Sequence, residues 1–595
     1  MIPSLLLYRV FAFLLPPCLL SLTYLYAYPV INGCSFPAPK LAKGGPGGET
    51  CAFGSKNDTN LGHIQGEREG GRSLVEALDW RKWFPVSEKA PFRLLALGDP
   101  QLEGDSSIPQ LPPIRLPTAR EIIARDGNAL KESWDSLGLF VQVFLFIIRK
   151  TIDLWGNDWY LAHVYRSMHW WTEPTHQTVL GDLLGSQWVS DEEFESRSTR
   201  FWTRAFRGGK RVDDELMSGQ RGRTEVLGAD PSWSERLINV VGNHDIGYAG
   251  DIDEKRIQRW ERNFGKVNWD VAFTLSNTSA VREELKQDGI TSTPSIRLLI
   301  LNSMNLDTLA ISGDLQKQTY DFVNEVIGSS HPVEDRRHLT LLLTHIPLHK
   351  EQGVCFDAPF FDFWDDSSVK EQNHISADVS KGAVLEGLFG LSGNPYAPAS
   401  GKGRKGIILT GHDHEGCDVF HHISTEPVSV ANSPDDSVGE ASNSPPSWQA
   451  TQFKTAKREG LITNPSVNGI REVTVRSMMG DYGGNAAMLS AWWDETIQEW
   501  TVEVAMCAVG IQHVWWGIHT FAAIELVLFL AAVVTYLREV RPDSKPTKPT
   551  TGPQSGKNPK AVKAKATSDQ HGEASPLRET EQKAKRKKLK ENGGS

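Results

Sequence analysis

The chain has 595 residues, of which 39% are hydrophobic and 19 are tryptophans, a composition typical of a globular protein with a large core and not of a disordered chain. Its formal net charge is -10, but residues 538–595 carry 15 Lys and Arg against 7 Asp and Glu, so the rest of the chain carries -18. An acidic body argues against nucleic acid as a partner of the main domain.

The N-terminal segment is almost wholly apolar over residues 5–31, where Arg9 is the only charged residue. That length is enough to cross a bilayer, so residues 1–31 are predicted to form a membrane anchor, and a cleaved signal peptide is the alternative. Residues 32–90 are a Gly- and Pro-rich stretch that we expect to be a connector, with a glycosylation sequon at Asn57.

The six cysteines lack the close spacing of a structural zinc site. Cys34 with Cys51, and Cys355 with Cys417, are candidate disulfides if the body lies in an oxidising compartment. Buried free thiols are the alternative.

Five apolar runs between residues 91 and 505 are followed by side chains that bind metals. These side chains are, in chain order, Asp99, Asp182, Asn243, His345 and the pair His412 and His414. Short apolar runs predict buried strands, and the ligand sites of α/β sheets lie at the carboxyl ends of the strands. We therefore expect the six residues to converge, although they span more than half of the chain.

Two further stretches of this domain are expected to play structural roles. Residues 137–148 are apolar but too few to span a bilayer, which predicts a core helix or, alternatively, a helix at the membrane surface. Residues 424–468 are rich in Ser, Pro and Asn and are expected to form an inserted surface loop.

The C-terminal part combines an apolar segment with a basic tail. Residues 514–537 are long enough to cross a membrane, and residues 538–595 are predicted to be disordered. The positive-inside bias places this tail in the cytosol and the body in the lumen, in agreement with a second sequon at Asn277. The Lys-rich tail could also bind anionic lipid, cargo receptors or coat machinery.

The donor set defines the metal chemistry. Carboxylate, amide and imidazole donors without a thiolate suit Mn, with Fe, Zn or Mg as alternatives, and Asp182 is the natural bridge between two ions. Two neighbouring divalent ions clamp a phosphate, supply hydroxide near neutral pH and stabilise the charge of an in-line transition state.

Ordered motifs over about residues 90–505 resemble those of the calcineurin-like metallophosphoesterase superfamily. They are Gly-Asp-Pro-Gln at 98–101, Gly-Asp-Leu-Leu at 181–184, Gly-Asn-His-Asp at 242–245, Thr-His at 344–345 and Gly-His-Asp-His at 411–414. The resemblance implies an α/β fold, with a β-sandwich flanked by helices and a two-metal site between the sheets.

The resemblance also implies a role for each ligand residue. One ion would be held by Asp99, Asp182 and His414, and the other by Asp182, Asn243, His345 and His412. His244 would protonate or stabilise the leaving oxygen, and Asp245 would orient its ring. Gln101 stands where the family usually has histidine, so it is at most a weak ligand through its amide oxygen.

A narrower resemblance rests on Trp-Gly-Asn-Asp-Trp-Tyr at 155–160, on residues 181–188 and on the two membrane segments. These features are similar to the phosphodiesterases that remodel glycosylphosphatidylinositol (GPI) anchors, and the glutamine of the first motif resembles that of some fungal members. The group also carries cysteines near Cys355 and Cys417.

This second resemblance implies removal of ethanolamine phosphate from a mannose of the anchor, the second in preference to the first. GPI-anchored proteins would be the substrates, in the membrane of the endoplasmic reticulum or early Golgi, and their transport would be promoted. The alternatives are a phosphoesterase for nucleotides, phospholipid headgroups or phosphoproteins, and a non-catalytic protein of cargo sorting or ion homeostasis.

Overall fold

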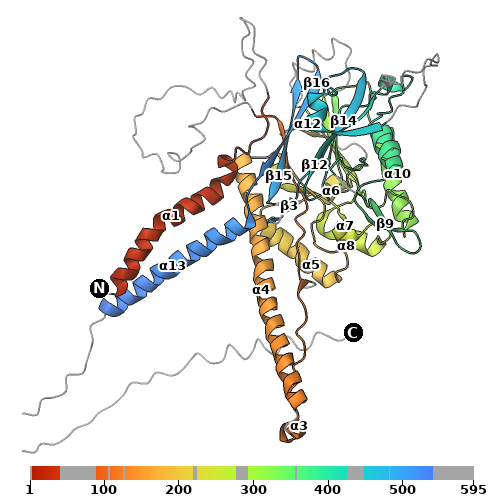
Figure 1. Ribbon diagram of the computed structural model, residues 1–595. Coiled ribbons are helices and arrows are strands. Elements are labelled where there is room, and N and C mark those ends of the chain that lie inside the picture. The colour runs from red at the N-terminus through yellow and green to blue at the C-terminus, as the bar shows by residue number, and fades with distance from the viewer. Residues whose placement is uncertain are drawn as a thin grey trace, which may run out of the picture. The chain divides into compact units, whose positions relative to one another are not determined.

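The structure, a computed structural model, describes residues 3–39, 89–104, 107–124, 127–218, 224–275, 293–355, 358–424, 448–480 and 483–540. Two units are distinguished, Met1–Thr535 and Tyr536–Ser595, and the contacts below lie within the first. Two β-sheets pack against each other and helices lie on their outer sides (Figure 1). The predicted fold class is therefore confirmed.

The first sheet carries the first three ligand motifs. Its strands are, in spatial order, β16 (Glu499–Ala508), β15 (Asn485–Asp494), β1 (Phe92–Leu97), β2 (His176–Leu180), β5 (Arg236–Val240) and β3 (Lys210–Arg211). β1, β2 and β5 are parallel neighbours, and β15 is antiparallel to β1. Parallel neighbours end at one edge of a sheet, so the residues that follow these three strands lie side by side.

The second sheet carries the remaining motifs. Its strands are, in spatial order, β13 (Trp448–Gln452), β12 (Cys417–Ser424), β14 (Val467–Thr474), β11 (Gly406–Thr410), β8 (His338–Leu343), β7 (Ser295–Ile300), β6 (Trp269–Thr274) and β4 (Thr224–Val226). β8 and β11 are parallel neighbours, so their carboxyl ends also lie together. β9 (Phe361–Phe363) and β10 (Val369–Gln372) form a separate hairpin.

Alternate side chains of each central strand enter two different cores. Phe92 and Leu94 of β1 pack between the sheets with Leu341 of β8, whereas Leu95 of β1 packs on the outer side. Strands buried on both faces favour apolar residues on both faces, which explains why β1, β8 and β11 were recognisable as continuous apolar runs. β2 (His176–Leu180) is the exception, with three buried polar residues before Val179.

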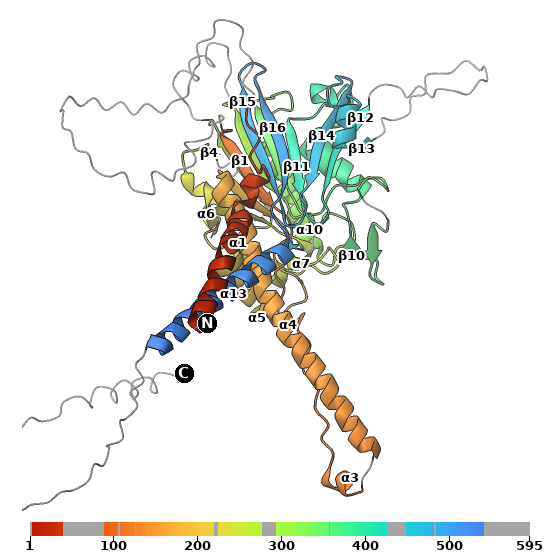
Figure 2. The ribbon, with the colours of Figure 1, turned by 60° about the vertical axis from the view of Figure 1, so that its left-hand side comes forward.

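Helices cover the outer faces of the sheets and the ends of the strands (Figure 2). The α-helices of the domain, apart from α4, are α3 (Ala119–Ile123), α5 (Asp191–Arg200), α6 (Asp214–Met217), α7 (Asn243–Ile246), α8 (Glu254–Phe264), α10 (Gly313–Ser329), α11 (Ala377–Val379) and α12 (Phe453–Arg458). Short 3₁₀ or π segments are η3 (Phe201–Ala205), η4 (Pro231–Ser234), η5 (Ser380–Leu388) and η6 (Pro398–Gly401). Their boundaries follow local chemistry: Asp253 caps α8, and Gly265, at φ 115°, ends it.

Two long apolar helices could cross a membrane, α1 (Pro3–Ile31) and α13 (Gln512–Val540), with mean hydropathies of 1.9 and 2.2. They lie side by side in both ribbon views, and the rings of Phe11 and Phe529 are 5.2 Å apart. The two expected membrane segments are thus helices long enough for that role.

The disulfides differ in part from the prediction. Cys355 is bonded to Cys417, as expected, but Cys34 is bonded to Cys507 and not to Cys51, so that predicted pair is wrong. The reason is tertiary: Cys34 follows α1 and Cys507 ends the strand before α13, and folding brings the two together across a sequence separation of 473.

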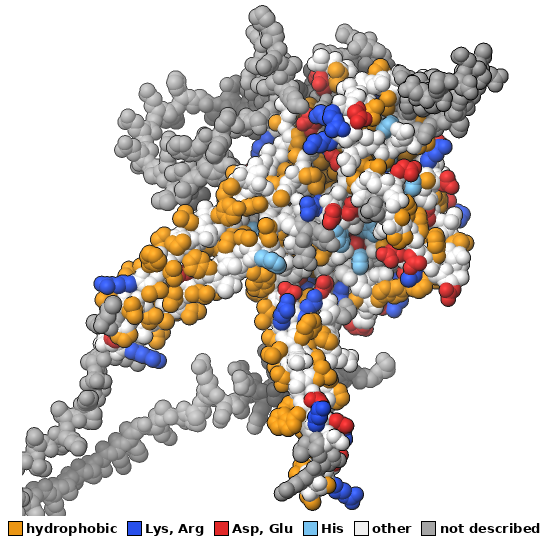
Figure 3. Space-filling view, in the orientation of Figure 1, with side chains coloured by type: hydrophobic (Ala, Val, Ile, Leu, Met, Phe, Trp, Pro, Cys, Tyr) orange, Lys and Arg blue, Asp and Glu red, His pale blue; other side chains and the backbone are white. Residues whose placement is uncertain are grey.

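Helix α4 (Gly127–Thr172) corrects a second expectation. The apolar run 137–148 is not a core helix, because Leu139, Leu145 and Phe146 are 51%, 59% and 49% exposed. Only the C-terminal part of α4 packs against the domain, where Tyr160 and Leu161 are buried. Figure 3 shows hydrophobic side chains along the exposed arm as well as along α1 and α13. The membrane-surface alternative stays a prediction.

The expected inserted loop 424–468 is corrected in its second half, where residues 448–458 form a strand and a helix, β13 and α12. Residues 425–447 lie outside the described part of the chain. Trp448, Thr451 and their neighbours pair with the edge of β12, which supplies the hydrogen bonds that a loop would lack. Cys51, the sequons at Asn57 and Asn277, most of the connector and the basic tail lie outside the described residues.

Candidate metal centre

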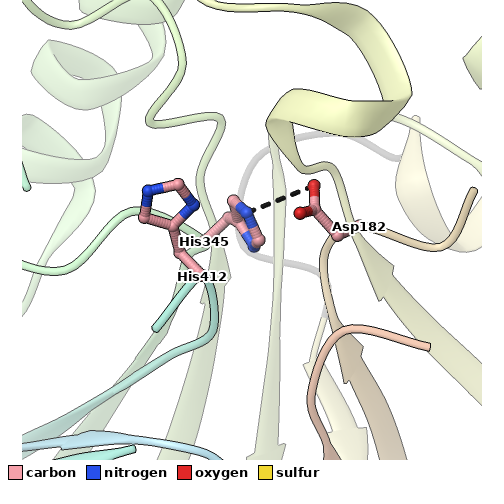
Figure 4. Close-up of side chains that lie close together, drawn as sticks. All are labelled: Asp182, His345 and His412. Carbon is pink, nitrogen blue, oxygen red and sulfur yellow. Dashed lines mark ion pairs between the residues drawn. The ribbon is translucent and has the colours of Figure 1, made fainter. Parts of the chain in front are cut away.

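The two sheets bring the predicted ligand residues to one place. Asp182, His345 and His412 form one group of potential ligands, and Asp99, Asp182 and His414 form a second, with the ligand atoms of each group within 4.8 Å of one another. Asp182 belongs to both groups, as expected of a bridging carboxylate. Figure 4 shows the first group, in which the two imidazoles come from the second sheet and the carboxylate from the first.

A glycine precedes four of the six predicted ligands, and packing explains it. These glycines are Gly98, Gly181, Gly242 and Gly411. A Cβ at Gly181 would overlap the ring of His345, and a Cβ at Gly242 would overlap Asp182. The strand ends therefore approach more closely than any residue with a side chain would allow, and this closeness concentrates the ligands.

Three of the ligand residues adopt strained backbone conformations. Asp99, Asp182 and His412 have φ angles of 45°, 50° and 73°, in the left-handed region that L-residues avoid. Each such residue costs of order 1–3 kcal/mol, and the surrounding fold must hold it in place. Strain gathered on residues that converge is typical of a functional site.

Backbone carbonyls orient the two imidazoles. His345 Nδ1 donates to the carbonyl of Leu180 at 2.7 Å, which directs Nε2 towards Asn243 Oδ1, 3.0 Å away. His412 Nε2 donates to the carbonyl of Gln372 at 2.9 Å, which leaves Nδ1 as the acceptor, 3.0 Å from the same oxygen. Two ring nitrogens and an amide oxygen thus meet at one point, as metal ligands do. The orienting role of Gln372 had no signal in the sequence.

Gln101 lies at the centre as well. Its side-chain amide nitrogen is 3.1 Å from Asp182 Oδ2 and 3.1 Å from His414 Nε2. The residue that departs from the family motif therefore occupies the place of a ligand. Rotation of the amide by 180° would present its oxygen to the same point.

The electrostatics of the site match a bound cation. Burial raises the pKa of Asp99 well above its usual range. Burial also opposes ionisation of Asp182, but the imidazoles of His345 and His244 hold its pKa below the usual range. The pKa of His345, which burial alone would lower, is raised by Asp182 to about 9. Buried carboxylates beside one another need positive charge, and divalent ions supply it.

Asp245 has a different role from the predicted one. Its carboxylate accepts hydrogen bonds from the backbone N–H groups of Gly242, at 2.8 Å, and Leu184, at 3.0 Å, and does not contact the His244 ring. Among the described residues, His244 Nδ1 has no hydrogen-bond partner. Asp245 thus links the loop after β2 to the loop after β5. The turn after Gly242 directs the Asp245 side chain into the protein and the His244 side chain towards solvent.

Comparison with known proteins places this geometry in context. No family model matches the chain. It is 27% identical over 428 residues to Protein TED1 of Saccharomyces cerevisiae, which covers 63% of this chain and 76% of that protein. It is 26% identical over 398 residues to an uncharacterized protein of Schizosaccharomyces pombe, which covers 65% and 82%.

Vertebrate proteins that are similar to this chain have a name that states a class of activity. Metallophosphoesterase 1 of Mus musculus is 24% identical over 294 residues, which cover 47% of this chain and 59% of the mouse protein. The chain is thus similar to proteins named metallophosphoesterase 1 over about half of its length. Together with the two Asp/His groups, this relationship confirms the predicted class of enzyme, a metal-dependent phosphoesterase.

Proposed function

We propose that this metallophosphoesterase is a membrane-anchored, lumenal phosphodiesterase that removes ethanolamine phosphate from a mannose, the second, of GPI anchors. Such remodelling would promote transport of GPI-anchored proteins out of the endoplasmic reticulum. The observation that carries the proposal is the pair of ligand groups that share Asp182. The narrower substrate rests on the motif at 155–160 and on the two apolar helices.

The donor set divides between two divalent ions, with manganese as the preferred metal. Asp99, Asp182 and His414 would hold one ion, and Asp182, Asn243, His345 and His412 would hold the other. Bound there, the ions would polarise the phosphodiester and supply the attacking oxygen near neutral pH. The carbonyls of Leu180 and Gln372 keep the imidazoles aimed at the ion.

His244 is the residue suited to the leaving group. Its side chain is 38% exposed, whereas that of Asp182 is 1% exposed, so it reaches a substrate that the buried ligands do not. Its Nε2 lies 3.8 Å from Asp182 Oδ2, and its backbone N–H donates to Asp182 Oδ1 at 2.9 Å. A protonated imidazole in this position would give its proton to the mannose oxygen as the bond to phosphorus breaks.

The lumenal orientation is supported by covalent chemistry. Two disulfides lie in or beside the domain, and disulfides persist in oxidising compartments such as the lumen of the secretory pathway. A membrane anchor also concentrates the enzyme with a lipid-anchored substrate, because both are confined to two dimensions.

The test is mass spectrometry of anchor glycans from cells that lack the endogenous protein and express wild type or Asn243→Ala. Asn243 joins the two imidazoles, so its loss should abolish turnover, and anchors with an extra ethanolamine phosphate should accumulate. Fragmentation identifies the mannose. Asn394→Ala, an exposed turn residue outside the centre, is the matched control and should behave as wild type.

Identical glycans in wild-type and Asn243→Ala cells would refute the GPI substrate. Purified protein with added manganese would then be assayed on generic phosphodiesters. Hydrolysis that Asn243→Ala abolishes would leave a phosphodiesterase with another substrate, and no hydrolysis by wild type would favour the non-catalytic alternative.

A further inference from the structure

A cavity of about 850 Å³ lies apart from the metal centre, where α1, α4 and α13 meet. Its walls are mainly aromatic, and the residues used below are Tyr26, Trp159, His163, Trp515 and Trp516. Tyr26 belongs to the last turns of α1, and Trp515 and Trp516 belong to the first turn of α13. The cavity therefore lies at the ends of the apolar helices that join the domain.

The cavity holds hydrogen-bonding atoms without partners. Among the described residues, Trp515 Nε1, His163 Nε2 and Trp159 Nε1 are buried and make no hydrogen bond. Trp515 and His163 are only 5% and 7% exposed, so water has little access to either side chain. These three nitrogens are buried within the walls, so the cavity presents mainly aromatic ring surface to a ligand.

The walls are built by close packing between α4 and α13. A Cβ at Gly156 would overlap the ring of Trp516, so glycine is required for the approach of the two helices. Tyr160 donates to the carbonyl of Gly510 at 3.1 Å and fixes the start of α13. The motif at 155–160, which the metal centre does not use, thus builds the cavity.

Positive charge is available on the cavity lining. Arg166 and Arg207 line it and are exposed, and neither takes part in an ion pair between described residues. The Arg166 guanidinium donates to the carbonyl of Arg204 at 3.4 Å and lies 5.9 Å from the Trp159 ring centroid. The lining also contains Glu235, but this carboxylate is paired with Lys210 at 2.6 Å. Two uncompensated guanidinium groups favour an anion, and guanidinium binds phosphate well.

We propose that this cavity binds an anionic phospholipid of the surrounding bilayer, with its phosphate at Arg166 and Arg207. The aromatic rings would pack against the glycerol region of the lipid, and the acyl chains would follow the apolar surfaces of α1 and α13. Aromatic residues gather at membrane interfaces because their rings suit an apolar side and a polar side at once. The proposal does not depend on the substrate of the metal centre.

The test reconstitutes the full chain in nanodiscs of phosphatidylcholine and phosphatidylserine, then extracts it in mild detergent and counts retained lipids by native mass spectrometry. Wild type should retain one phosphatidylserine. The double variant Arg166→Gln/Arg207→Gln should retain it roughly 10- to 30-fold less, as expected for two cations at a membrane surface.

The matched control is Arg262→Gln/Arg458→Gln, which removes two exposed arginines outside the cavity and should retain the lipid as wild type does. Hydrolysis of a soluble phosphodiester reports that each variant is folded and should be unchanged. Equal phosphatidylserine retention by wild type and Arg166→Gln/Arg207→Gln would overturn the proposal. So would retention of phosphatidylcholine alone or of no lipid.

Discussion

The metal centre and the aromatic cavity are two sites built on opposite principles. At the metal centre, small motifs deliver polar ligands from five strand ends, with glycines and strained residues that allow a close approach. At the cavity, bulky aromatic side chains from three helices enclose an apolar space. The metal centre suits a metal ion, which requires ligands at fixed distances and angles. The aromatic cavity suits a flexible apolar ligand, whose conformation can fit the shape of the cavity.

The largest effect is expected at the bridging carboxylate. Asp182→Asn removes a charge that both ligand groups share, so both ions should be lost and kcat/KM should fall by about 1,000-fold or more. Metal content measured by mass spectrometry should fall in parallel, whereas lipid retention at the cavity should not change. Full metal content in the variant would contradict the two-group site.

His244→Gln should lower kcat by roughly 100-fold or more while metal content remains that of wild type, because the lost group donates a proton and holds no ion. The loss should be much smaller for a nitrophenyl phosphodiester, whose leaving group needs no proton. An equal loss for both kinds of substrate would argue that His244 binds phosphate instead. Either result, with metal content unchanged, would show that His244 acts on the substrate and does not bind a metal ion.

Cys34→Ser should destabilise the region where α1 and α13 join the domain and should leave the metal content unchanged. Removing the bond to Cys507 should lower the free energy of unfolding by about 2–4 kcal/mol. With a protease site inserted between residues 40 and 88, the cut wild-type chain should migrate as one species on a non-reducing gel, and the cut variant as two. Two species from wild type would refute the disulfide.

The smallest effect concerns pH. Burial, with His519 nearby, lowers the pKa of His163 from 6.5 to about 4. The unfolded chain therefore binds more protons between these values, so this histidine's contribution to stability is full above pH 6.5 and decreases as the pH falls towards 4. His163→Gln should reduce the loss of stability over that range by about 2 kcal/mol, measured by thermal unfolding at several pH values. Unchanged pH dependence would mean that the cavity leaves this histidine accessible to protons.

The candidate ligand residues were recognisable in the sequence for a local reason. A strand buried on both faces is rich in apolar residues, so the sequence shows where it ends. A glycine followed by a metal-binding residue then marks the loop after the strand. The convergence of Asp99, Asp182 and His345 followed from a general property of parallel strands and needed no knowledge of the contacts between sheets.

The cavity, the Cys34–Cys507 bond and the exposed arm of α4 were decided by tertiary structure alone. Each depends on which distant segments pack together, and no local pattern records that Trp516 lies over Gly156 or that Cys34 lies beside Cys507. Sequence reasoning failed in the same way for Asp245. Its position next to His244 suggested a contact with that ring, but the turn after Gly242 directs it to the backbone N–H groups of Gly242 and Leu184. Residue types and their spacing in the sequence therefore identified the candidate metal ligands. Contacts between distant segments determined the cavity, the Cys34–Cys507 bond and the partners of Asp245.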